Sequence, residues 1–409
     1  MDTAVHAAVQ RAAREAYGRL VAFVSARSHD VAAAEDALSE AFLCALQTWP
    51  ATGIPDRPEA WLLVAARRRL LDVVRHRQVR QAAEPLLLAA FDEADACVHT
   101  PFPDDRLKLM FVCAHPAIDE MVRAPLMLQA VLGLDAARIA SAFLVSPAAM
   151  GQRLSRAKAR IRASGLPYEV PARDELPGRL EAVLDAVYAA YGRGWDDVLG
   201  ADPRHPQLAR EALELGALLV RLLPDEPEAP GLLALMLYTQ SRSPARRDAE
   251  GRYVALSEQD PTCWSAEQIE LADACLARSA SMDRSGRYQL EAAIQSVHAH
   301  RLRTGRTDWD AIVVLYRGLL RMSPRLGVLL GHAAATAQVE GPSHGLAWLD
   351  RLPAEAVGTH QPYWALRAHL LALLARTSEA RAAYSRAIAL CEDTAMRSYL
   401  LARARELDS

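Results

Sequence analysis

Helical periodicity, broken at intervals by prolines and glycines, runs through nearly all of this sequence. From Val5 to Val24, for example, apolar residues recur every three or four positions, the spacing of the buried face of an amphipathic helix. Alanine, leucine and arginine dominate, and aromatic residues make up only 6% of the 409 residues. This composition favours helices over strands. We therefore predict an all-α fold of two to four domains, about 100–200 residues each.

Proline- and glycine-rich segments divide the N-terminal part into predicted helices. Asp30 is a suitable N-cap for a helix from Val31 to Trp49. The loop that follows, 50–58, contains three prolines and a glycine. The next helix, 59–81, begins directly after a proline, as helices often do. Residues 83–105 lack sustained periodicity and are predicted to be a linker.

A helix-turn-helix pattern follows this linker. A short helix, Asp135–Ala142, is followed by a tight turn at Phe143–Val145. Ser146 is a suitable N-cap and Pro147 occupies the first position of the next helix. That helix is predicted to end near Ala163. In DNA-binding proteins the second helix of such a pair enters the major groove.

The net charge of −3 conceals three strongly charged blocks. Residues 59–82 carry a net +4, residues 83–105 a net −6, and residues 138–162 a net +6. Only Lys108 and Lys158 are lysines, so nearly every cation is an arginine, the side chain best suited to phosphates and base edges. Two basic helices joined by an acidic segment predict two nucleic-acid contacts on one chain.

The remainder of the chain, 178–409, follows a second linker at 166–177 and is again helix-forming. Small and aromatic residues alternate in Tyr363–Asp393 as they do in tetratricopeptide helix pairs. A plain helical bundle is the alternative. From Pro171 onwards the net charge is −4 (27 basic against 31 acidic residues), which disfavours a third contact with DNA.

Several classes of protein are disfavoured by what the sequence lacks. The six cysteines are far apart and form no CxxC pair, and Cys113 with His115 supplies only two candidate metal ligands. There is no phosphate-binding loop, nucleophile elbow or HExxH motif. We expect no enzyme, no cofactor and no metal. No apolar stretch of about 18 residues and no signal-peptide core is present, so we expect a cytoplasmic protein without a membrane partner.

Three motifs resemble one family. Residues 30–46 (DVAAAEDALSEAFLCAL) with Trp49, and residues 57–67 (RPEAWLLVAAR), resemble region two of the extracytoplasmic-function sigma factors of the sigma-70 family. Residues 138–158 (RIASAFLVSPAAMGQRLSRAK) resemble region four of the same factors. Residues 223–237 (LPDEPEAPGLLALML) resemble a subgroup with a C-terminal extension that is described as tetratricopeptide-like.

This resemblance implies a bacterial promoter-specificity factor. Residues 1–82 would bind core RNA polymerase and the −10 element, and residues 106–165 the −35 element. The polymerase contacts of the family are the β′ clamp helices and the β flap, and the other partner is promoter DNA. The extension, 178–409, would be a regulatory domain that could carry a regulatory protein partner.

The predicted polymerase-binding residues are three acids of the helix that starts at Val31. Glu35, Asp36 and Glu40 lie on one side of this helix, while Leu38 and neighbouring alanines can face inward. An acidic face suits a basic helical partner, and the resemblance implies the clamp helices. The alternative is an acidic face that is merely solvated.

The predicted DNA-binding residues lie on the two basic helices. On the first, Trp61 is expected in the core rather than stacked on a base, and the resemblance places a pocket for an unstacked base in the preceding loop. On the second helix, the N-terminal side chains are expected at base edges and the later ones at phosphates. The residues on the first helix are Arg68, Arg75 and Arg77. Those on the second are Ala148, Ala149, Gln152 and Arg153 for bases, and Arg156, Lys158 and Arg160 for phosphates.

Two other classes of function fit parts of the sequence. A helix-turn-helix transcriptional regulator would use the second basic helix without replacing a sigma factor. A tetratricopeptide interaction protein would use only the extension. A simple regulator has no need of the acidic helix at Val31, and a scaffold has no need of segregated charge blocks.

Overall fold

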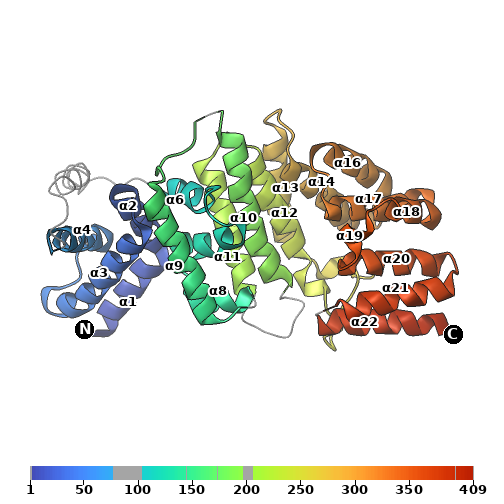
Figure 1. Ribbon diagram of the computed structural model, residues 1–409, viewed down its shortest axis with the longest axis horizontal. Helices are drawn as coiled ribbons and strands as arrows, with labels where there is room; N and C mark the ends of the chain where they lie inside the picture. The colour runs from blue at the N-terminus through green and yellow to red at the C-terminus, as the bar shows by residue number, and fades with distance from the viewer. Residues whose placement is uncertain are drawn as a thin grey trace. The chain divides into compact units, whose positions relative to one another are not determined.

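The computed structural model describes residues 2–76, 104–143, 145–172, 174–196, 206–391 and 393–408. Within these ranges every regular element is a helix, apart from one isolated bridge between Arg247 and Tyr253. The prediction of an all-α fold is confirmed. None of the helices in this described part is long and apolar enough to cross a membrane. The chain divides into two compact units, Met1–Arg193 and Gly194–Ser409, which are treated separately (Figure 1).

Unit 1, Met1–Arg193, contains the segments that resemble sigma regions two and four. Its helices are α1 (Asp2–Glu15), α2 (Tyr17–Ser28), α3 (Val31–Thr52), α4 (Pro58–His76), α6 (Arg106–Cys113), α7 (Glu120–Leu132), α8 (Ala136–Ala142), α9 (Pro147–Ser164) and the start of α10 (Leu176–Asp196).

Both predicted N-caps of unit 1 are confirmed. The Asp30 side chain accepts a hydrogen bond from the backbone N–H of Ala33, 3.1 Å away, at the start of α3. The Ser146 hydroxyl accepts one from the N–H of Ala149, 3.2 Å away, at the start of α9. Each cap satisfies a backbone donor that has no partner within its own helix.

Two predicted boundaries are wrong. The predicted single helix from Val5 to Val24 is divided at Ala16, where the backbone departs from helical geometry (φ −116°, ψ −16°). The helix predicted to end at Trp49 continues through Pro50 and ends at Gly53, whose φ is 87°. A proline removes one helical hydrogen bond but has a helical φ, so the chain can complete another turn before the glycine stops it.

The core of unit 1 is built around α2. Six consecutive residues of this helix, Leu20–Ser25, are at most 1% exposed, so its middle is buried on all sides. It packs against α3, which precedes the acidic linker, and against α6 and α7, which follow it. At Gly18 the approach is so close that a Cβ atom would lie 1.8 Å from the carbonyl oxygen of Val131 in α7. Helices from before and after the acidic linker therefore share one core.

Unit 2, Gly194–Ser409, is a succession of packed helices. Most of the longer helices pack on the next one in the chain, as α12 does on α13, α16 on α17 and α20 on α21. This is the arrangement of helical-repeat domains, and the tetratricopeptide assignment stays a prediction. The helices are α11 (Pro206–Leu222), α12 (Glu228–Ser241), α13 (Ala266–Ala280), α14 (Arg287–Ala299), α15 (Arg301–Thr304), α16 (Trp309–Met322), α17 (Leu326–Glu340), α18 (Pro342–Leu349), α19 (Ala354–Val357), α20 (Gln361–Leu373), α21 (Thr377–Ala389) and α22 (Thr394–Arg405).

Polar contacts connect distant parts of unit 2. The Glu228 carboxylate accepts hydrogen bonds from the backbone N–H groups of Tyr288 (2.9 Å) and Gln289 (3.0 Å), and so caps α14. Arg403 of α22 forms an ion pair with Glu258, in the irregular segment between α12 and α13. The Glu228 contacts join α12 to α14, and the Arg403–Glu258 pair ties the C-terminal helix of unit 2 to the segment that precedes α13.

One buried and one exposed leucine of α3 test which side of this helix faces the core. Leu38 is fully buried, so Leu38→Ala should lower the free energy of unfolding by about 2–5 kcal/mol. Leu43 is 58% exposed, so Leu43→Ala should change it by no more than about 0.5 kcal/mol. Urea denaturation of the two variants measures the difference. Equal losses would contradict the orientation of α3.

Candidate polymerase and nucleic-acid interfaces

The three acids predicted to form one polymerase-binding face have different surroundings. Asp36 and Glu40 are exposed, whereas the side chain of Glu35 is only 14% exposed. Glu35 points at α9, which packs on α3. The three acids predicted to form a single face are therefore one buried and two exposed carboxylates. The role of this face in polymerase binding stays a prediction.

Glu35 is paired with Lys158 of α9. The Lys158 ammonium group donates to Oε2 of Glu35, and the Lys158 side chain is only 10% exposed. The other carboxylate oxygen, Oε1, is buried with no hydrogen-bond partner among the described residues. Burial raises the pKa of Glu35, and the charge of Asp36 adds to the rise, while Lys158 opposes it. The pair is thus a largely desolvated contact between two predicted functional residues.

Neutral groups surround this ion pair. Burial raises the pKa values of the Tyr17 hydroxyl, the Cys113 thiol and the Tyr168 hydroxyl, and the negative charge of Glu35 adds to the rise at Tyr17 and Cys113. All three groups therefore stay protonated at neutral pH. In such surroundings a lone charge is costly, so each member of the Glu35–Lys158 pair depends on the other.

Further polar contacts lie beside this pair. Arg162 of α9 approaches Asp30 at 3.5 Å, but its side chain is 58% exposed, so the contact contributes little. Arg27 of α2 binds Asp105, directly before α6, at 3.1 Å, and the Asp105 side chain is 4% exposed. Arg162 thus meets the residue that caps α3, and Arg27 meets the last residue of the acidic linker, so both contacts join residues 2–76 to the part of unit 1 that starts at Asp104.

Glu40 has a partner within its own half of unit 1. Arg69 of α4 binds it with two nitrogens, Nε to Oε2 at 2.5 Å and Nη2 to Oε1 at 2.8 Å. Both side chains are 48% exposed. This two-pronged geometry orients α4 on α3, although water screens the charges.

The first basic helix, α4, borders a groove against α3. The groove has a volume of about 600 Å³ and includes Trp61, Arg68 and Arg69 in its lining. The Trp61 ring also meets the buried Trp49 ring edge to face at 5.4 Å, so it both packs on the core and forms a wall. Arg68 is exposed. The other two predicted DNA contacts of this helix lie wholly or partly outside the described residues. Arg75 is on α4 but its side chain is not described, and Arg77 is not described at all.

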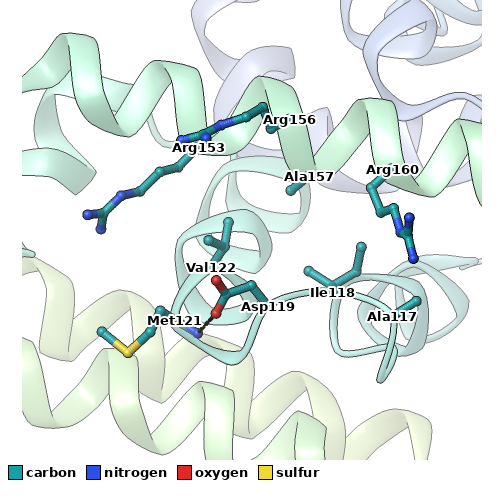
Figure 2. A pocket seen from close by; sticks show the side chains of 9 residues that line it. All are labelled: Ala117, Ile118, Asp119, Met121, Val122, Arg153, Arg156, Ala157 and Arg160. Atoms are coloured by element: carbon teal, nitrogen blue, oxygen red, sulfur yellow. Dashed lines mark hydrogen bonds between the residues drawn. The ribbon is translucent and has the colours of Figure 1, made fainter.

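The second basic helix, α9, carries three arginines on one side. Arg153, Arg156 and Arg160 line a groove of about 460 Å³ together with Ile118 and Met121 from the segment around the start of α7 (Figure 2). Arg156 and Arg160 are exposed and Arg153 is half-buried. Two of the other predicted base contacts, Ala148 and Gln152, are exposed, and Ala149 is half-buried.

Sequence reasoning missed two features of α9 and the groove beside it. Met121, in the groove, is 61% exposed, and an apolar side chain at a helix start gave no signal of that. Lys158 is buried rather than available to a phosphate. A signal for this did exist, because Lys158 is four residues after the buried Leu154 and three before the buried Ile161. That spacing places it on the inward face of the helix.

A double-mutant cycle tests the buried ion pair. Lys158→Met leaves the Glu35 carboxylate buried without its cation, so the free energy of unfolding should fall by about 3–5 kcal/mol at neutral pH. Adding Glu35→Gln should recover most of the loss, because the buried group is then uncharged. Losses that simply add in the double variant would contradict the pairing.

The same single variant has a predictable pH dependence. Burial raises the pKa of Glu35 and Lys158 opposes the rise. In Lys158→Met this opposition is lost, so the pKa of Glu35 in the folded variant rises further above its unfolded value than in wild type, and the folded variant binds the proton more tightly. The stability of Lys158→Met relative to wild type should therefore improve as the pH is lowered from neutral and should worsen as it is raised. Urea denaturation across this range measures it, and a pH-independent difference would contradict the assignment.

Comparison with known proteins assigns two parts of the chain to families. Residues 13–80 match the family described as Sigma-70 region 2, and residues 179–280 match a family of unknown function, DUF6596. An uncharacterized protein of Rhizobium meliloti (strain 1021), R00370, is 41% identical over 374 residues, which cover 90% of this chain and 88% of that protein. The region 2 match spans α2, α3 and α4, where the acidic helix and the first basic helix lie.

Proposed function

Because this chain belongs to the same family as the Rhizobium meliloti protein and is a sigma-70 family factor by its region 2, we propose that it directs promoter-specific transcription initiation as an extracytoplasmic-function sigma factor. The observation that carries this proposal is the region 2 match over residues 13–80. Region 2 implies binding of core RNA polymerase and of promoter DNA. The site of action would be the cytoplasm, and no chemical reaction is assigned to the chain.

Region two would hold the polymerase and the −10 element. Asp36, exposed on α3, is the acid best placed to meet a basic clamp helix. Arg68, with Arg75 and Arg77 further along, would contact the DNA strand. The groove of about 600 Å³ beside Trp61 is large enough for an unstacked base.

Region four would read the −35 element with α9. Ala148, Ala149, Gln152 and Arg153 occupy its N-terminal half, the part that meets base edges in helix-turn-helix proteins. Gln and Arg suit adenine and guanine respectively. Arg156 and Arg160, exposed on the same side as Arg153, would bind phosphates. The β flap of the polymerase would be a further partner of region four.

The C-terminal extension would regulate these regions. Support comes from α10, where the DUF6596 match begins and which is part of unit 1 for most of its length. Arg179 of this helix donates a hydrogen bond to the carbonyl oxygen of Phe111 in α6, 3.0 Å away. A partner bound to the tetratricopeptide-like helices could act on region four through this attachment. A helix-turn-helix regulator that does not replace sigma is the alternative, but it would have no use for region 2.

Reversing one exposed charge tests the polymerase contact. Asp36→Lys should weaken binding of core polymerase by tenfold or more, about 1.4 kcal/mol, because a cation would face a basic helix. Glu270→Lys, which changes another exposed acid, on α13, is the matched control and should leave the affinity unchanged. Fluorescence anisotropy with labelled protein measures both. Equal affinities for the two variants would rule out the acidic face of α3 as the docking site.

Two arginines of α9 should behave differently on DNA. Arg153→Ala should lose about 1–3 kcal/mol on the preferred −35 element and relax the preference at one base pair. Arg160→Ala should weaken binding to all sequences alike and reduce its salt dependence. Binding to a randomised promoter library separates the two effects, and identical profiles would show the assignment of roles to be wrong.

A further inference from the structure

Two surfaces that the proposed function gives to different partners are in contact with each other. Glu35 belongs to the acidic side of α3, assigned to core polymerase, and Lys158 belongs to α9, assigned to DNA. The two side chains form an ion pair with each other, and each side chain is at most 14% exposed. Neither side chain can reach an outside partner in this arrangement.

The contact extends well beyond this one ion pair. Gly18 meets the backbone of Val131, and the Tyr168 ring, after α9, meets the His29 ring edge to face at 5.4 Å. With the Arg27–Asp105 contact, these pairs all join the region-two helices to the region-four helices. Region four is therefore seated on region two over α2 and the N-terminal part of α3.

The chemistry of α9 at this contact matches that expected of the polymerase. It presents Lys158 to Glu35 and Arg162 to Asp30, two cations from one helix set against carboxylates at the start of α3. A basic helix of the polymerase would bring the same charges to the same acids. Because a helix with its side chains is about 10 Å across, both helices cannot occupy that side of α3 together.

We propose that α9 is an internal occupant of the polymerase-docking surface, so that core polymerase and region four compete for the acidic side of α3. This inference rests on the proposed function and adds a mode of regulation to it. In the closed form Glu35 is paired with Lys158 through Oε2. In the open form a cation of the polymerase replaces Lys158, which becomes available to promoter phosphates.

The competition makes the exposure of Lys158 dependent on polymerase. Pulling Lys158 away without a replacement leaves a buried carboxylate uncompensated, which is strongly unfavourable, whereas exchanging one cation for another is not. Polymerase shifts the equilibrium towards the open form because it binds only that form. Arg153, Arg156 and Arg160 lie on the other side of α9, so weak DNA binding is retained in the closed form.

A distance measurement on the full-length chain tests the competition. Labels at Gln10→Cys on α1 and Ser164→Cys on α9, both exposed positions, report the separation of the two regions once Cys44, Cys97, Cys263 and Cys275 are replaced by serine. Binding of core polymerase should lengthen the label distance by about 10 Å or more, the width of a helix. Polymerase binding at an unchanged distance would overturn the inference and leave the proposed function standing.

A wedge at Gly18 tests the same claim in the free protein. The three atoms nearest to a Cβ at Gly18 all belong to Val131, so Gly18→Ala acts on the contact between the regions. Gly18→Ala should lengthen the distance between the two labels and should increase the affinity for core polymerase several-fold. Gly327→Ala, in α17 with nothing within 4 Å of its Cβ, is the matched control and should change neither.

The outcomes of the two experiments are separable. A wedge that lengthens the distance without tightening core binding would overturn the inference, since the closed form would then not compete with polymerase. If neither wild type nor Gly18→Ala bound core polymerase, the proposed function would fail, and the inference with it.

Discussion

The complete burial of the middle of α2 is the constraint on which unit 1 depends. Leu20–Ser25 have no exposed side, so α2 needs α3 on one flank and α6 and α7 on the other. Its close approach to α7 is possible only because Gly18 has no side chain. This apolar contact brings α9 over α3, and the Glu35–Lys158 pair then specifies how the two halves are aligned, as buried polar pairs can.

α9 presents two functionally different faces. One carries Lys158 with the buried Leu154 and Ile161 and faces the interior of unit 1. The other carries the three arginines of the groove at Met121 and faces solvent. The proposed roles follow from this division, because only a solvated face can read DNA, whereas the inward face serves to hold region four on region two.

Local features were predictable from the sequence, and distant pairings were not. The caps at Asp30 and Ser146, the all-α fold and the N-terminal part of α3 follow from rules that act over a few residues. The pairing of Glu35 with Lys158 joins residues 123 positions apart, and periodicity carries no information on which charged side chains will meet across a core. For the same reason three acids at neighbouring positions of α3 were assigned one environment, although α9 covers Glu35 and leaves Asp36 exposed.

Transcription in a purified system tests the central claim most directly. The full-length chain, mixed with core RNA polymerase and a DNA template selected for binding by the chain, should yield a run-off transcript from one start site, and core polymerase alone should not. Asp36→Lys should lose this transcript while still binding the DNA, because its region four is unaltered. Binding of the selected DNA by the wild-type chain without any core-dependent transcript would contradict the account and would favour a regulator that does not replace sigma.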